Sequence, residues 1–256
     1  MTGPAEDTSR LYFLSDVHLG VGTPDIERRK RDLLLHVFDI MRTDAAGLYI
    51  VGDLFDFWYE YRHAVPRGMH AVLTALEALA CRIPVVYLAG NHDFAIGRTF
   101  TDMNIRVERD DVSFEHEGTR FWVFHGDGLA LRDGGYRALK RVLRNPLSQW
   151  LFRWLHPDVG IGLAHRFSHG SRDHTSSKDF GEHDGMYGEA ERRITSGTDI
   201  VVMGHRHRPS LTPIGNGLYV NLGDWIHHFT YAVHTRGSMQ LMTMKNGYAA
   251  PFSEDR

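Results

Sequence analysis

The sequence is poor in cysteine and has no long apolar run. Its 256 residues include one cysteine, Cys81, which excludes an internal disulfide framework and a thiolate-rich zinc site. No stretch reaches the ~18 apolar residues of a membrane span. The first ten residues, MTGPAEDTSR, lack the apolar core of a signal peptide. We therefore expect a cytoplasmic protein.

A strong excess of charge is also absent. The 29 basic and 32 acidic residues give a net charge of −3, so no global basic field favours nucleic acid, and we expect none as a partner. The residue in excess is histidine, with 17 copies. The length suits one large domain, which we place at residues 10–256 and which can bury a substantial core.

The N-terminal part alternates predicted strands with predicted helices. Residues 11–15, 48–51 and 83–89 are apolar almost throughout, as buried parallel strands are. Residues 25–43 and 68–80 lie between them and carry helical patterns. This order predicts an α/β fold with right-handed crossovers and a parallel sheet.

The second half changes character. Residues 112–124 read as a hairpin that turns at His116-Glu117-Gly118. A helix at 181–196 and a strand at 200–203 follow. The later predicted strands are expected to be mostly antiparallel, and they lie near 218–222, 229–235 and 239–244.

Residues 131–180 are expected to be an insertion over the main domain. The stretch is rich in Trp, Leu and Arg, and Pro146 and Pro157 punctuate it, which predicts two or three short helices. Basic residues combined with Trp and Leu in helices are typical of an interfacial segment, so residues 134–180 also suit peripheral contact with a membrane. An ordinary amphipathic helix pair packed on the core is the alternative.

Five predicted strands end in short runs of polar residues. Because the carboxyl ends of strands in an open α/β sheet converge on one crevice, we expect these runs to meet. Each run alone is typical of a helix cap or turn, but their joint occurrence predicts a metal site. The runs are Ser15-Asp16-Val17-His18, Gly52-Asp53-Leu54-Phe55-Asp56, Gly90-Asn91-His92-Asp93, His125-Gly126-Asp127 and Gly204-His205-Arg206-His207.

The donor types in these runs are carboxylate, amide oxygen and imidazole. They suit Mn²⁺, Fe²⁺, Zn²⁺ or Co²⁺. Two such ions that share one carboxylate can activate water and stabilise an in-line displacement at phosphorus. The sequence therefore predicts metal-dependent chemistry on a phosphate group.

In this order, the five runs resemble those of the calcineurin-like metallophosphoesterases. The resemblance implies a four-layer α-β-β-α sandwich with a helical cap insertion and a centre of two divalent ions, for which we favour Mn²⁺. It assigns one ion to Asp16, His18, Asp53 and His207, and the other to Asp53, Asn91, His125 and His205. It makes His92, Asn91 and Asp53 the catalytic set, with His92 over the phosphate, and gives Asp93 and Asp127 an orienting role.

Further motifs resemble those of one branch, the UDP-2,3-diacylglucosamine diphosphatases of lipid A biosynthesis. They are residues 52–58 (GDLFDFW), 125–128 with 133–136, 176–178 (SSK), 205–209 and 221–225. This resemblance implies a lipid-linked nucleotide sugar as substrate, with UMP and 2,3-diacylglucosamine 1-phosphate as products, and a cap that holds acyl chains. Candidate substrate contacts are Asp133, Tyr136, Arg166, Ser171 and Lys178.

Two alternatives to this function remain open. Better-known members of that branch carry Arg where this chain has His92, so a phosphoesterase acting on other phosphodiesters or nucleotides is the second reading. A non-catalytic scaffold is a third, but such scaffolds typically lose metal ligands, and all of them are present here. Trp58 and Trp225, near motif ends, could line the pocket or pack in the core.

Overall fold

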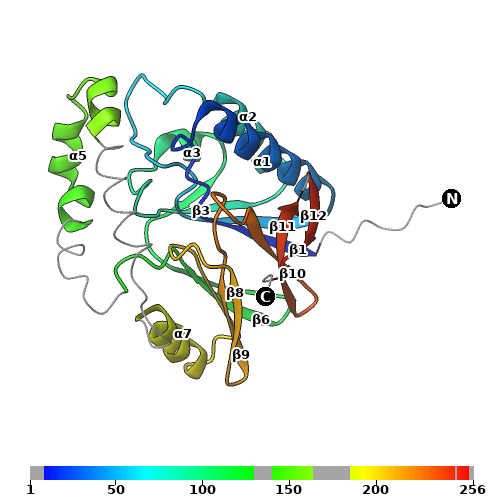
Figure 1. The fold of residues 1–256 in the computed structure, drawn as a ribbon. Helices are drawn as coiled ribbons and strands as arrows, with labels where there is room; N and C mark the ends of the chain where they lie inside the picture. Colours follow the sequence, from blue (N-terminus) through cyan, green and yellow to red (C-terminus); the bar gives the residue numbers. More distant parts are fainter. Residues whose placement is uncertain (1–8, 130–139, 164–184, 246, 254–256) are drawn as a thin grey trace.

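The computed structural model describes residues 9–129, 140–163, 185–245 and 247–253. All five candidate substrate contacts, from Asp133 to Lys178, lie outside the described residues. The described chain contains two mixed β-sheets (Figure 1).

The first sheet places the N-terminal strands beside the C-terminal ones. Parallel pairing joins β1 to β2, β2 to β3 and β3 to β4, as the alternating pattern predicted. An antiparallel pair links β1 to β10, and antiparallel strands continue from there to the edge. In spatial order the strands are β12 (Tyr248–Pro251), β11 (Ser238–Lys245), β10 (Thr230–Thr235), β1 (Arg10–Leu14), β2 (Ala45–Val51), β3 (Val85–Leu88) and β4 (Arg106–Glu108).

The later strands are mostly antiparallel, as expected, but one of them also makes a parallel pair in the second sheet. The strand predicted near 218–222 is β9, and it runs parallel to its neighbour β7. The reason is an unpredicted edge strand, β8, which turns at Gly215 and Asn216 and so reverses the chain once more. The order is β5 (Val112–His116), β6 (Thr119–Phe124), β7 (Ile200–Met203), β9 (Gly217–Asn221) and β8 (Ser210–Ile214).

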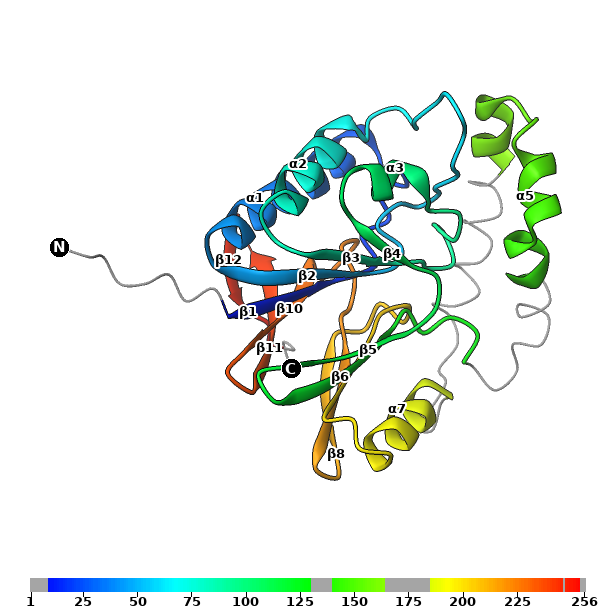
Figure 2. The same ribbon diagram turned by 180° about the vertical axis from the view of Figure 1, so that it is seen from behind.

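Helices cover the outer faces of both sheets, which gives four layers (Figures 1 and 2). Helices α1 (Pro24–Asp44) and α2 (His70–Ala80) pack on the first sheet, and α7 (Gly185–Thr195) packs on the second. A third apolar cluster fills the space between the sheets. Strand β1 is apolar throughout because both of its faces are buried. Leu11 and Phe13 face the other sheet, while Tyr12 and Leu14 face the helices.

The described part of the predicted insertion is helical. Residues 140–144 and 157–163 are helical, and α5 (Pro146–Phe152) lies between them. Pro146 and Pro157 stand at helix starts, where proline costs no hydrogen bond. Asn145 caps α5 by accepting a 2.8 Å hydrogen bond from the backbone of Leu147. In both views α5 stands at the side of the molecule opposite β11 and β12.

Other helices and strands were not predicted from the sequence because they are short. Helix α3 (Arg98–Asp102) has five residues and β4 has three, too few to show a period. Trp58 and Trp225 are both buried, and Trp58 packs on Phe55 and Phe100, so core packing is the reading that the structure supports. None of the helices in the described ranges has the length and apolar character needed to cross a membrane.

Candidate metal centre

The structure brings the five polar runs together at one edge of the sandwich. From the first sheet, Asp16 and His18 follow β1, Asp53 follows β2, and residues 91–93 follow β3. From the second sheet, His125 follows β6, and residues 205–207 follow β7. This convergence is what parallel strands ending at a common edge produce.

The backbone at this edge is held in an unusual conformation. Five metal-ligand candidates have a positive φ between 47° and 68°, the left-handed region that costs a non-glycine residue about 1–2 kcal/mol. They are Asp16, His18, Asp53, His205 and His207. Because such conformations persist only where the surroundings impose them, their concentration here marks a site whose side-chain directions matter more than local stability.

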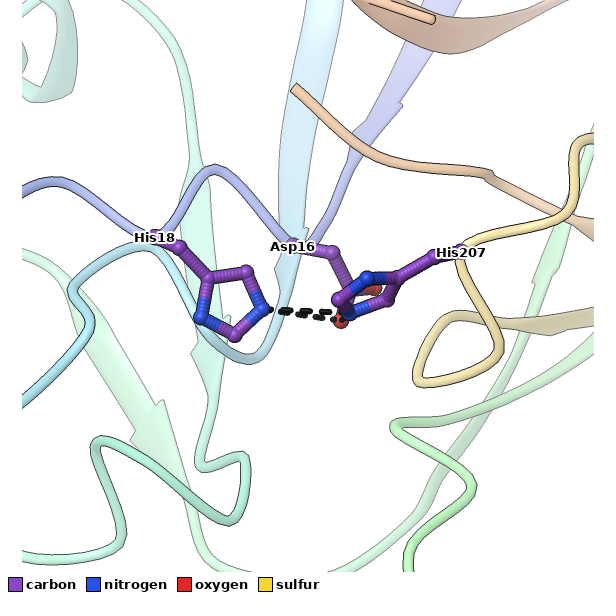
Figure 3. Close-up of side chains that lie close together, drawn as sticks. All are labelled: Asp16, His18 and His207. Atoms are coloured by element: carbon purple, nitrogen blue, oxygen red, sulfur yellow. Dashed lines mark hydrogen bonds and ion pairs between the residues drawn. The ribbon is translucent and has the colours of Figure 1, made fainter. Parts of the chain in front are cut away.

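One cluster consists of Asp16, His18 and His207, whose ligand atoms lie within 4.8 Å of one another (Figure 3). Asp16 Oδ1 lies 3.1 Å from Nε2 of His207 and 3.6 Å from Nε2 of His18. The two Nε2 atoms are 3.2 Å apart. Asp16 Oδ1 is buried and accepts no hydrogen bond from the described residues. A buried oxygen without a donor, facing two imidazole nitrogens, fits a divalent cation.

A second cluster is centred on Asp53 and His125. Nε2 of His125 lies 3.3 Å from Oδ2 of Asp53 and 3.0 Å from the amide oxygen of Asn91. On its other side, His125 Nδ1 is 2.8 Å from the carbonyl of Val51, which fixes the ring orientation and leaves Nε2 facing the site. The His205 ring lies 5.2 Å from the His125 ring.

Asp53 lies between the two clusters. Its carboxylate also lies 3.8 Å from Nε2 of His18. It forms one possible ligand group with His18 and His92 and another with Asp16 and His125. The buried His and Asp clusters are therefore consistent with a dinuclear metal site that shares one carboxylate.

Buried charges of opposite sign stabilise each other in this site. Burial raises the pKa of Asp53, but the nearby His125, His92 and His18 together outweigh it and hold that pKa well below its usual range. Burial lowers the pKa of His125, yet the surrounding carboxylates, of which Asp53 contributes most, together raise it to about 10. His205 is different, because burial and the nearby His125 lower its pKa to about 4. The site therefore holds ionised carboxylates that favour positive charge.

One functional residue was not assigned from the sequence, although it stands three residues after Asp53. Asp56 is buried, and its carboxylate lies 3.4 Å from Nδ1 of His18 and 3.7 Å from Nδ1 of His92. Its carbonyl lies 2.9 Å from the same His92 nitrogen. Asp56 thus orients two histidine rings, and its place in the Gly52–Asp56 run was the available signal.

His92 lies close enough to His18 and Asp53 to form a possible ligand group with them. Its side chain is 9% exposed, its ring stands edge-on to His18 at 4.7 Å, and Nε2 lies 4.0 Å from Oδ2 of Asp53. Its backbone N–H donates to Oδ1 of Asp53. Burial lowers the pKa of His92. The partly exposed ring is therefore placed between the buried ligands and solvent.

The two residues expected to orient neighbours make different contacts. Asp93 accepts hydrogen bonds from the backbone of Leu54 and Gly90 and from the Tyr87 hydroxyl, so it joins the loops that follow β2 and β3. Burial raises the pKa of Asp93 to about 6. Asp127 forms a 2.6 Å ion pair with Lys140, which connects the loop after β6 to the helical segment at 140–163.

Asp224 was also missed. It is fully buried, and Oδ1 accepts backbone hydrogen bonds from residues 226, 227 and 228. Oδ2 lies 3.9 Å from Nδ1 of His207, on the side of the ring away from Asp16. The Asn221–Trp225 run contained it, but a lone Asp after a strand resembles a turn residue.

Comparison with known proteins agrees with this geometry. A model of the calcineurin-like phosphoesterase family matches residues 9–209. The chain belongs to this family and is a metal-dependent phosphoesterase. Among solved structures, vacuolar protein sorting 29 from Cryptosporidium parvum is similar at a TM-score of 0.49 and 15% identity, over 96% of this chain and 98% of that one.

The curated relatives are more specific. A UDP-2,3-diacylglucosamine hydrolase of Porphyromonas gingivalis is 29% identical over 93% of this chain and 98% of that protein. Proteins of the same name from Pseudomonas entomophila and Stutzerimonas stutzeri are 34% and 32% identical, over 84% and 95% of this chain and 90% and 99% of theirs.

Proposed function

We propose that the protein hydrolyses the pyrophosphate bond of UDP-2,3-diacylglucosamine to give UMP and 2,3-diacylglucosamine 1-phosphate. The observation that carries the proposal is the position of Asp53, a buried carboxylate between two groups of histidines at the edge where both sheets end. The names of the relatives supply the substrate.

The proposed ligand sets divide around Asp53. Asp16, His18, Asp53 and His207 would hold one divalent ion, and Asp53, Asn91, His125 and His205 the other, with Mn²⁺ favoured by the oxygen and imidazole donors. Bound there, two such ions would supply Lewis acidity, which activates water and neutralises charge on phosphate oxygens. The buried Asp16 Oδ1 that accepts no hydrogen bond from the described residues supports this assignment.

His92 would serve the reaction through one ring nitrogen. Nδ1 faces the carbonyl of Asp56 and donates to it, which leaves Nε2 to exchange a proton within the site. Departure of a phosphate, whose second pKa is about 6, needs little help from an acid, whereas departure of an alkoxide needs a proton. A proton donated by His92 is therefore less important for cleavage of an anhydride than for cleavage of an ester.

The helical segment at 140–163 supports a lipid substrate. Its exposed apolar side chains are more than a soluble substrate requires, and they include Leu147, Trp150, Leu151, Trp154 and Val159. It also contacts the loop after Asp56, since Phe152 lies against Phe57 and Tyr59. We propose that residues 131–180 form a cap over the acyl chains and contact the inner membrane face peripherally, with Asp133, Tyr136, Arg166, Ser171 and Lys178 near the polar part of the substrate.

The test uses purified protein, Mn²⁺ and two substrates. UDP-2,3-diacylglucosamine in detergent should yield UMP, and a soluble phosphodiester should be cleaved far more slowly. Rapid cleavage of the phosphodiester without UMP release from the lipid would overturn the substrate assignment and favour a phosphoesterase of other specificity.

A further inference from the structure

A buried lysine lies behind the candidate metal centre. Lys30, in the second turn of α1, is only 1% exposed. Its Nζ lies 2.5 Å from the carbonyl oxygen of His18 and 3.2 Å from that of Val17. It also forms a 2.7 Å ion pair with Glu27, one turn earlier on the helix. The ammonium group therefore binds the backbone of the loop that carries His18.

Glu27 holds the other end of the same loop. One carboxylate oxygen accepts a 2.7 Å hydrogen bond from the backbone N–H of Gly20, and the other accepts one from Gly22. Gly20 has a φ of +103°, and a Cβ on Gly22 would lie 2.7 Å from Ile26 and 2.9 Å from Glu27. The two glycines thus let the loop pass close to the helix, where Lys30 and Glu27 bind it.

The loop is held from the opposite side by the chain that follows β2. The backbone N–H of His18 donates to the carbonyl of Asp53 at 3.0 Å, and that of Leu19 donates to the carbonyl of Leu54 at 3.0 Å. The peptide groups around His18 therefore lie between two supports, and α1 provides one of them. These contacts oppose relaxation of His18 from its left-handed conformation, in which the ring faces Asp16 and His207.

Packing alone does not explain why the buried side chain against the His18 loop is a lysine. Removing an ammonium from water is costly, and an apolar side chain would cover the loop without that cost. An apolar side chain could not bind the His18 carbonyl, however. The ammonium is therefore suited to fixing the direction of one peptide group, and with it the direction of the His18 ring.

We propose that Lys30, supported by Glu27, is a positioning residue that holds His18 in place as a metal ligand. The inference rests on the proposed function, because it assumes that His18 is a ligand of one ion. The proposal concerns only the ion position that includes His18. The ligands on the second sheet, including His125 with its bond to Val51, have supports of their own.

The experiment measures Mn²⁺ binding to the metal-free full-length protein by calorimetry, without substrate. In Lys30→Met, one of two ions should bind about 10- to 100-fold more weakly, as expected when an outer support of a ligand is lost, while the other changes by less than about threefold. Excess Mn²⁺ should restore kcat. Arg28→Met, on the same helix but with a side chain that is 64% exposed, is the matched control and should bind both ions normally.

Two results would overturn the proposal. One is a folded Lys30→Met variant that binds both ions with wild-type affinity, and the other is an equal loss at both positions that excess Mn²⁺ does not reverse. If Lys30→Met does not fold, Glu27→Gln decides, because it keeps the ammonium but removes its ionic partner. Wild-type affinities in that variant would also refute the proposal.

Mn²⁺ binding to the wild-type protein distinguishes failure of the Lys30 proposal from failure of the proposed function. A wild-type protein that binds no Mn²⁺ would refute the metal centre regardless of Lys30. Hydrogen exchange in the metal-free protein tests the support itself. The backbone amides of His18 and Leu19 should exchange faster in Lys30→Met than in Arg28→Met, and equal rates would show that Lys30 does not hold the loop.

Discussion

Nε2 of His125 lies 3.3 Å from Oδ2 of Asp53, although the two residues follow strands of different sheets. The pair is fully buried, and each partner favours the charged form of the other. Removing the carboxylate therefore leaves buried imidazoles without their main counter-charge.

Asp53→Asn should abolish hydrolysis. Because Asp53 is the ligand shared by the proposed ion positions, kcat should fall beyond the roughly 100-fold that loss of an outer hydrogen-bond partner costs. Elemental analysis should show fewer than two ions per chain. Asp199→Asn is the matched control, since Asp199 pairs with exposed Arg120 at the starts of β7 and β6, whereas the site lies beyond the ends of these strands. Near wild-type turnover in Asp53→Asn would refute the metal centre.

His92→Ala should separate the two kinds of phosphate substrate. We expect a loss of about 10²- to 10⁴-fold in kcat on a phosphodiester with an alkoxide leaving group, where proton transfer matters. The loss on the lipid pyrophosphate should be smaller, because its leaving group is a phosphate. Metal content should stay at the wild-type value. Equal losses on both substrates would contradict the proposed use of Nε2.

Two glycines of the helix at 157–163 provide a matched pair that tests the cap. A Cβ on Gly160 would lie 2.2 Å from the Tyr61 hydroxyl, whereas nothing lies within 4 Å of one on Gly162. Gly160→Ala should displace the segment from the loop that carries Tyr59 and Tyr61 and raise KM for the lipid. Gly162→Ala should leave KM unchanged and add up to about 1 kcal/mol of stability. If both variants keep the wild-type KM, this contact does not serve the substrate.

The exposed tryptophans of the cap should anchor the protein to vesicles. Trp150 and Trp154 are 52% and 75% exposed, so replacing both with Ser should hardly change stability. We expect sedimentation with anionic phospholipid vesicles to weaken by roughly tenfold, because interfacial binding scales with buried apolar area. Tyr248→Ser, an equally exposed aromatic on β12, is the control. Unchanged sedimentation would argue against membrane contact through this surface.

His234 should make the protein less stable in acid. It is fully buried on β10 beside Phe121, neither ring nitrogen has a hydrogen-bond partner among the described residues, and burial lowers its pKa. The unfolded chain therefore binds the proton more readily, so this contribution is complete above about pH 6.5 and is lost as the pH falls below it. Denaturant titrations should show a smaller loss between pH 7.5 and pH 5 in His234→Leu than in wild type. His36→Leu, at an exposed position, should behave as wild type.

The sequence predicted the helices and strands that are long enough to show a regular pattern of apolar residues. Strand β1 and helices α1 and α2 appear within two residues of their expected ends. Strand β8 could not be recognised, because Ser210, Thr212 and Pro213 break the apolar pattern of an edge strand. Without β8, the parallel pairing of β9 with β7 could not be foreseen.

Site residues could be predicted from the sequence where their type and their position after a buried strand both indicate a metal ligand. Asp16, Asp53 and His125 could be assigned to one centre because each follows a buried strand. Lys30 could not, because a lysine in a charged helical run resembles a solvated side chain. Only the tertiary structure shows that this lysine is buried against the His18 loop. Asp56 and Asp224 escaped for a related reason, since an Asp near a turn has many ordinary roles.

The division of the candidate ligands between two sheets has a mechanical consequence. Asp16, His18, Asp53 and Asn91 belong to one layer, and His125, His205 and His207 belong to the other. Ions bound among them would cross-link the layers at one edge of the sandwich, a bond between sheets that a chain with a single cysteine cannot make covalently. We expect that a chelator, by removing the ions, makes this edge unfold before the rest of the sandwich. The free energy of unfolding and the catalytic activity should therefore fall together.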